Sequence, residues 1–148
     1  MKAIHLLGVF IVFILLVSCK KENNNNNSIQ NQIQTSVQSG TWRVTKYIDS
    51  GVDETNYFSG YGFTFGSNGI LSVASGASNY SGTWVITDSN SNDDTQNDLD
   101  FIISFPVGGY LESLNSDWNF ISQSSVKIEL IDVSGGGGGT DYLTFEKN

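Results

Sequence analysis

The residues that most often carry enzyme chemistry are scarce in this chain of 148 residues. The single histidine is His5 and the single cysteine is Cys19, so the chain beyond residue 19 has neither. It therefore has no Ser–His or Cys–His pair and no histidine metal site. Paired carboxylates can hydrolyse glycosides, but the spacing of Asp100, Glu112 and Glu129 singles out no pair. The sequence predicts a protein that is not an enzyme and has no cofactor.

Oxygen-bearing side chains alternate near the middle of the chain in the manner of a calcium loop. Asp88, Asn90, Asn92 and Asp94 stand at the positions of the first ligands of an EF-hand, and Ca²⁺ prefers such oxygen ligands. The turn glycine and the bidentate glutamate of that loop are replaced by aspartate and leucine. Because Asp and Asn also favour turns, we expect a solvated hairpin loop over 88–98, with calcium as the weaker alternative.

The first eighteen residues have the pattern of a secretory signal peptide. A lysine precedes an apolar run over 3–17, which is shorter than the roughly 20 residues of a membrane-spanning helix. Leu16-Val17-Ser18-Cys19 resembles the lipobox of bacterial lipoproteins. This resemblance implies cleavage before Cys19 and attachment of acyl chains, such as palmitate, that would anchor the mature protein to a membrane.

The residues after Cys19 indicate which membrane the lipid anchor would occupy. Lys20 stands where inner-membrane lipoproteins of enteric bacteria carry a retention aspartate. Lys20-Lys21-Glu22 resembles the surface-export tethers of Bacteroidetes lipoproteins. Both features imply a lipid-anchored protein of the outer membrane, on its periplasmic or its cell-surface face.

Residues 23–38 consist of Asn, Gln, Ser and Thr with three apolar residues, Ile29, Ile33 and Val37. The spacing of four between these three is compatible with a helix. The polar majority favours a solvated linker instead. We therefore expect residues 19–39 to hold the lipidated cysteine and a disordered tether.

Residues 40–148 have the length of one small domain. This segment contains four basic residues and fourteen carboxylates, which gives it a formal charge of −10. Such a domain repels nucleic acid and anionic lipid headgroups, so neither is expected as a partner. The simplest explanation of this charge is that it keeps the domain soluble. We expect the protein to be a monomer.

Runs of alternating apolar residues, separated by Gly, Asn, Asp and Ser clusters, predict strands and hairpins throughout this domain. In the first run, Trp42, Val44 and Ile48 share one face. Gly66-Ser67-Asn68-Gly69 is a hairpin signal, because Asn and Gly accept positive φ. A single helical turn is compatible with residues 111–114. We expect eight strands, at 41–49, 61–65, 70–74, 80–87, 99–105, 118–123, 126–133 and 142–147.

Eight short strands with local connections favour an antiparallel up-and-down barrel, because closure removes exposed sheet edges. A β-sandwich is the alternative. Gly40-Thr41-Trp42 resembles the Gly-x-Trp signature of lipocalins, and a second copy, Gly82-Thr83-Trp84, makes the domain similar to lipocalin-like lipoproteins of Bacteroidetes. In lipocalins the first Trp plugs one barrel end beneath an Arg of the last strand, where this chain has Lys147.

The aromatic residues expected inside the barrel are the candidate ligand site. An eight-stranded barrel either holds one small ligand or is filled by side chains. We expect a small hydrophobic or amphipathic ligand in the interior. In the alternative, side chains fill the barrel, and loops at 88–98, 106–117 and 134–141 bind protein or glycan. The interior candidates are Trp42, Phe63, Phe65, Trp84, Phe101, Phe105, Trp118 and Phe145.

Overall fold

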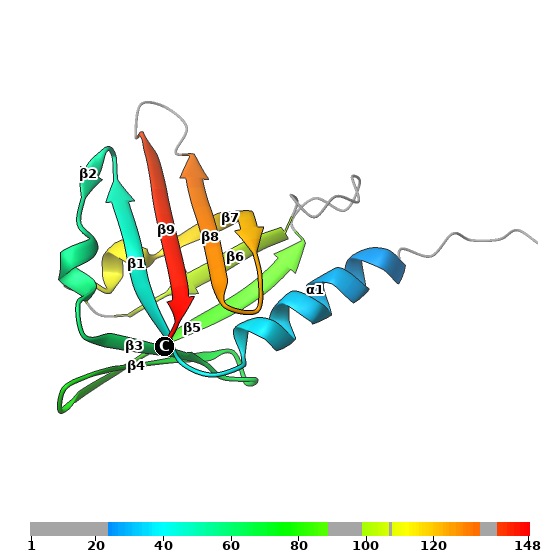
Figure 1. Ribbon diagram of the computed structural model, residues 1–148, viewed down its shortest axis with the longest axis horizontal. Coiled ribbons are helices and arrows are strands. Elements are labelled where there is room, and N and C mark those ends of the chain that lie inside the picture. Colours follow the sequence, from blue (N-terminus) through cyan, green and yellow to red (C-terminus); the bar gives the residue numbers. More distant parts are fainter. Residues whose placement is uncertain (1–23, 89–98, 107, 134–138) are drawn as a thin grey trace, which may run out of the picture.

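The computed structural model describes residues 24–88, 99–106, 108–133 and 139–148, and Figure 1 shows a β-barrel with one helix beside it. Strands β3 to β9 pair antiparallel in chain order, β1 pairs with β3, and β9 pairs with β1 to close the barrel. The elements are α1 (Asn24–Val37), β1 (Trp42–Asp49), β2 (Val52–Asp53), η1 (Thr55–Phe58), β3 (Tyr61–Phe65), β4 (Ile70–Ser75), β5 (Ser78–Asp88), β6 (Leu99–Ser104), η3 (Glu112–Leu114), β7 (Ser116–Gln123), β8 (Lys127–Val133) and β9 (Thr140–Lys147).

This closure confirms the predicted eight-stranded up-and-down barrel, with β2 as one short addition, and the β-sandwich alternative is wrong. The predicted strand at 61–65 matches β3, and the other strands differ from their predicted bounds by one or two residues, at both ends for β5 and at one end for the rest. The expected helical turn near 111–114 is η3. Alternation therefore located the strands because each one buries a single face.

The antiparallel order places the strand connections at two ends of the barrel. One end, which we call the helix end, holds the start of β1, the β3–β4 and β7–β8 turns and the end of β9. The other, which we call the loop end, holds β2 and η1, the β4–β5 turn and the β6–β7 connection with η3. Figure 1 shows α1 lying across the helix end, near the β7–β8 turn.

Helix α1 corrects the expectation of a disordered tether over 19–39, because residues 24–37 form a helix. Ile33 and Val37 are fully buried against the barrel, and Ile29 packs partly beside them. Their spacing of four aligns them on one helix face, and packing of that face stabilises a helix that its polar composition alone would not. The side chain of Gln30 donates to the Ile86 carbonyl at 2.6 Å, and that of Ser36 to the Ser124 carbonyl at 3.2 Å.

The two tryptophans of the repeated Gly-Thr-Trp stretches are both buried near the helix end. The indole N–H of Trp42 donates to the Val37 carbonyl at 2.8 Å, and that of Trp84 to the Gly66 carbonyl at 3.0 Å. Each buried donor thus has a partner. The Nζ of Lys147 lies 5.1 Å from the centroid of the Trp42 ring. Lys147 therefore makes a cation–π contact with Trp42.

Strand β1 contains a bulge that changes which of its residues face the core. Its pairing with β9 shifts register between Val44 and Lys46. Tyr47 is consequently buried, and Ile48 is only half-buried. The prediction that Ile48 shares the inner face with Trp42 and Val44 is wrong, because the extra residue of a bulge reverses the alternation beyond it.

Several predictions fall outside the described residues. The signal peptide, the lipobox with Cys19, and most of the 88–98 loop lie there. No described helix is long and apolar enough to span a bilayer.

Candidate functional site

The eight aromatic candidates for the interior site do come together in the barrel core. Each of them is at most 4% exposed. They come from β1, β3, β5, β6, β7 and β9 and from the residue that follows β6. They are Trp42, Phe63, Phe65, Trp84, Phe101, Phe105, Trp118 and Phe145.

Within this core, the rings pack directly against one another. Phe65 is at the centre, with ring centroids 5.4 Å from Trp84, 5.4 Å from Phe101 and 5.6 Å from Phe145. Phe63 lies 5.3 Å from Phe145 in an edge-to-face arrangement. These separations are those of rings in contact. The space between these side chains is therefore taken by the rings themselves.

The β6–β7 connection covers part of the loop end and is fixed in place by hydrogen bonds. Leu111 and Leu114 of this connection are buried. The indole of Trp118 donates to the Leu114 carbonyl at 2.9 Å, and the hydroxyl of Tyr47 donates to the Ser113 carbonyl at 2.7 Å. Burial raises the pKa of the Tyr47 hydroxyl. Residues 111–114 of this connection are therefore tied to the barrel by buried side chains and hydrogen bonds, and Tyr110 directly precedes them.

Beside it lies a pocket of about 210 Å³, which we call the tyrosine pocket. Tyr110, which lines the pocket, stacks face to face on Tyr57 outside the lining, with centroids 4.1 Å apart and planes at 10°. Tyr61 and Tyr80 form a second stacked pair, at 6.2 Å and 23°. The exposed fractions of Tyr57, Tyr80 and Tyr110 are 43%, 37% and 52%. The lining residues are Tyr61, Tyr80, Gly108, Gly109, Tyr110 and Leu111.

Local structure explains why these tyrosines converge. Tyr61 opens β3 and Tyr80 lies near the start of β5, and β4 between them sets both at the loop end. Gly109 adopts φ +96°, a conformation that favours glycine, and it turns the chain just before Tyr110. Tyr57 lies in η1, which follows the β1–β2 turn.

The sequence analysis did not predict this pocket. Its three lining tyrosines, and Tyr57 that stacks on one of them, come from four separate segments, and no spacing along the chain connects them. The nearest signal was the expected loop over 106–117, whose Gly-Gly-Tyr lies in the pocket wall. An exposed aromatic beside a glycine pair is a weak signal that this loop carries a binding surface.

A second depression, which we call the outer groove, runs over the outside of β3, β4 and β5. Its volume is about 460 Å³, and a hollow of about 380 Å³ adjoins it near β1. Several of the outward-facing residues there have small side chains, among them Gly62, Ser72 and Ala74. The lining residues of the groove are Thr41, Gly62, Thr64, Ser72, Val73, Ala74, Asn79, Tyr80 and Ser81.

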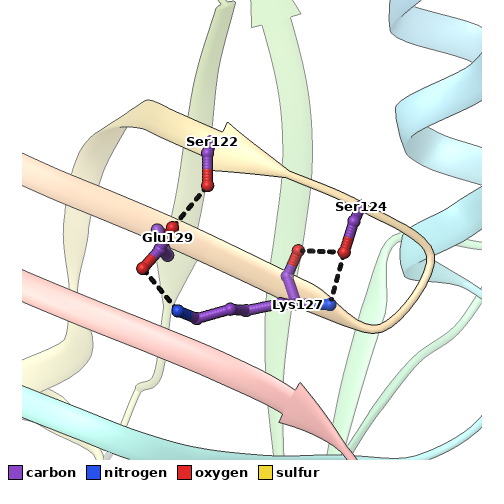
Figure 2. Close-up of polar contacts among 4 residues, drawn as sticks. All are labelled: Ser122, Ser124, Lys127 and Glu129. Carbon is purple, nitrogen blue, oxygen red and sulfur yellow. Dashed lines mark hydrogen bonds and ion pairs between the residues drawn. The ribbon is translucent and has the colours of Figure 1, made fainter.

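Figure 2 shows a polar network at the β7–β8 hairpin, close to the helix end. The Nζ of Lys127 lies 2.6 Å from Glu129, which also accepts a hydrogen bond from Ser122 at 2.5 Å. These contacts, first that of Lys127, hold the pKa of the Glu129 carboxyl below its usual value. The general acid of a glycosidase needs the opposite shift. The backbone N–H of Lys127 donates to the Ser124 hydroxyl at 3.0 Å, so the network fixes this hairpin.

Most of the candidate calcium ligands lie outside the described residues. Asp88 ends β5 opposite Leu99, whereas Asn90, Asn92 and Asp94 are not described. Within the described ranges, no three His, Cys, Asp or Glu residues gather closely enough to hold a metal ion. Calcium binding by the 88–98 loop therefore stays a prediction.

Comparison with known proteins supports the fold. No protein-family model and no curated protein matches this chain. A solved structure that is similar is the crystal structure of a DUF4847 family protein from Bacteroides vulgatus ATCC 8482. Its TM-score is 0.50 at 19% identity, over 78% of this chain and 97% of that chain. This structural similarity supports a small β-barrel fold, and at this sequence identity it gives no information about activity.

Proposed function

We propose that this protein is a lipid-anchored, non-catalytic binding protein that takes a small amphipathic ring in its tyrosine pocket. The observation that carries the proposal is the pocket itself, a hollow of 210 Å³ lined by Tyr61, Tyr80 and Tyr110, of which Tyr80 is 37% and Tyr110 52% exposed. Tyrosine combines an apolar face with a hydroxyl, so it suits a ligand that is apolar on its faces and polar at its edge.

The pocket is a better site than the barrel interior for such a ligand. The core rings around Phe65 contact one another at 5.4 to 5.6 Å, so a ligand between them would have to displace side chains. The ring of Tyr110 has one stacking partner, Tyr57, and is 52% exposed. A ligand at this ring buries apolar surface that now faces water, which favours binding.

The proposed anchor fits the position of this pocket. Cys19 precedes α1, which packs on the helix end, whereas the tyrosine pocket is at the loop end. A protein held at the outer membrane through Cys19 would then have its pocket at the end away from α1. Incorporation of labelled palmitate that is lost in Cys19→Ala, with release of the protein from the outer-membrane fraction, tests the anchor. Incorporation that persists in Cys19→Ala would refute it.

A neutral amphipathic ring such as indole tests the pocket, with binding to the purified mature protein measured by ligand-observed NMR. Tyr110→Ala should weaken binding about five- to tenfold, because it removes one aromatic contact. Tyr142→Ala, on β9 outside the pocket, is the matched control and should leave binding unchanged. Binding that survives Tyr110→Ala but responds to the core change Phe101→Leu would instead favour an interior site.

A further inference from the structure

We infer that the ligand of the tyrosine pocket is a cation, an aromatic ring with a short alkylammonium arm, and that the Glu112 carboxylate binds the ammonium. This inference rests on the proposed function, since the ring occupies the same pocket. It adds the charge of the ligand and a specificity-determining residue that is not one of the tyrosines.

The Glu112 carboxylate lies beside the wall of the pocket. Gly108 lines the pocket, and a Cβ atom built on Gly108 would lie 3.3 Å from Oε2 of Glu112. The backbone N–H of Glu112 donates to the carbonyl of Gly109, another lining residue, at 3.1 Å. A hollow of about 210 Å³ has room for about one ring. A short arm on a ring in this hollow therefore reaches the side of the wall where the carboxylate lies.

This carboxylate is available to a ligand. Within the described part of the chain, the Glu112 side chain forms no hydrogen bond and no ion pair, and it is exposed. By contrast, Asp53 at the same end of the barrel accepts a hydrogen bond from the Thr55 backbone N–H at 3.0 Å. A hydrogen bond between an ammonium and a carboxylate is stronger than one between neutral groups. Glu112 can make such a bond without giving up a bond to the protein.

The charges of the domain are divided between its two ends. Three of its four basic residues, Arg43, Lys127 and Lys147, lie at the helix end. The fourth is Lys46 in the middle of β1, whose Nζ lies 4.7 Å from the centroid of the Tyr142 ring. The loop end instead carries carboxylates, among them Asp49, Asp53, Glu54 and Glu112. A surface of one sign attracts ligands of the other sign, so the loop end favours a cation and disfavours an anion.

Tyr47, in contact with the connection that holds Glu112, responds to this negative charge. Its hydroxyl donates to the carbonyl of Ser113, the residue after Glu112. Burial raises the pKa of this hydroxyl, and negative charges from three segments add to the rise, those of Asp49, Asp141 and Glu54. A positive charge at Glu112 would therefore be stabilised by more than one carboxylate.

The tyrosines are compatible with a cationic ligand. Among the described residues that line the pocket, none is charged, so nothing in this lining repels an ammonium. The face of a tyrosine ring also attracts a cation. The ring of the ligand and its ammonium can thus both bind favourably, the ring to the tyrosines and the ammonium to Glu112.

The test compares three indoles that share a two-carbon arm and differ in the charge at its end: tryptamine, a cation, tryptophol, which is neutral, and indole-3-propionate, an anion. Ligand-observed NMR titration of the purified mature protein at neutral pH and low ionic strength gives the three dissociation constants. We expect tryptamine to bind about three- to fivefold more tightly than tryptophol, as for one exposed ion pair. Indole-3-propionate should bind more weakly than tryptophol.

Salt provides a second measurement of the same preference. The advantage of tryptamine over tryptophol should shrink at about 0.5 M salt, because exposed charges are then screened. Tryptophol that binds as tightly as tryptamine at low ionic strength, or indole-3-propionate that binds the most tightly of the three, would overturn the inference.

Two matched variants locate the charge that matters. Glu112→Gln keeps the size of the side chain and should bring tryptamine to within about twofold of tryptophol, with indole binding unchanged. The control, Glu146→Gln, removes the same charge from β9 at the helix end, where Glu146 lies 3.6 Å from Arg43. It should leave the preference for tryptamine as it is. Equal losses in the two variants would contradict a role for Glu112, because they would follow from the net charge alone.

Failure of this inference and failure of the proposed function give different results. If indole binds in a manner that depends on Tyr110 but tryptamine gains nothing over tryptophol, the ligand is not a cation and the proposed pocket stands. If Tyr110→Ala changes the binding of neither indole nor tryptamine, both are refuted.

Discussion

The barrel interior and the tyrosine pocket are both aromatic clusters, but their rings have different neighbours. Phe65 in the interior is 1% exposed and contacts three other rings. Tyr110 in the pocket stacks on one ring and is 52% exposed. A ring surrounded by side chains contributes to folding, whereas a ring held in place with a free face can contribute to binding. The two clusters should therefore respond differently to truncation.

Removal of a central core ring should cause the largest loss of stability. Phe65→Ala should lower the free energy of unfolding by about 3–5 kcal/mol, because it leaves a cavity among Trp84, Phe101 and Phe145. Urea denaturation followed by tryptophan fluorescence measures this change. A loss below about 1 kcal/mol would mean that the interior tolerates an empty space, which would strengthen the case for an interior ligand.

The next effect concerns the helix end, where α1 adds two apolar side chains to the same core. Ile33→Ala should cost about 2 kcal/mol, at the lower end of the range for buried isoleucine, because only one face of α1 is packed. It should also raise the solvent exposure of Trp42, whose indole bonds to Val37, and shift its emission to the red. The control is Gln32→Ala, on the exposed face of α1. If α1 were a loose tether, the two variants would be equally stable.

The features that could be predicted from the sequence are those that depend on neighbours along the chain. The alternation of Tyr61, Phe63 and Phe65 identified β3 because one sheet face is buried regardless of what covers it. Helix α1 could not be predicted this way, since its fold depends on a surface that the barrel supplies. The sequence already showed the spacing of Ile33 and Val37, but not the surface that buries them.

The candidate site shows the same limit. The eight core aromatics were predicted from strand alternation, and all of them are buried. The tyrosine pocket depends on strand pairing that brings Tyr61 and Tyr80 together across β4, and on a connection that returns Tyr110 to Tyr57. Both of these contacts depend on tertiary structure, so no local sequence pattern predicts them.

A smaller change in stability should distinguish the buried Tyr47 from the tyrosines of the pocket. Tyr47→Phe should cost about 1 kcal/mol at neutral pH, because the Ser113 carbonyl loses its hydrogen bond. Burial raises the pKa of Tyr47 in the folded state. Its hydroxyl therefore contributes stability that is complete below the unfolded pKa of about 10 and is lost as pH rises through the folded pKa.

Urea denaturation from pH 7 to 11 should accordingly show a smaller alkaline loss of stability in Tyr47→Phe than in the unchanged protein. Tyr110→Phe should remain within about 0.5 kcal/mol at neutral pH, since its hydroxyl is at an exposed site. An alkaline loss of equal size with and without the Tyr47 hydroxyl would show that its burial has no effect on stability.

The smallest effect should be the coupling between the stacked rings of Tyr57 and Tyr110. A double-mutant cycle with alanine at both positions should give a coupling of about 0.5 kcal/mol in the free energy of unfolding, the low end for aromatic pairs, because both rings face water. Ligand affinity should fall much further in Tyr110→Ala than stability does. A coupling above about 1.5 kcal/mol would place this pair with the core rings instead. The tyrosines would then be part of the folding core, and the contrast on which the proposed site depends would disappear.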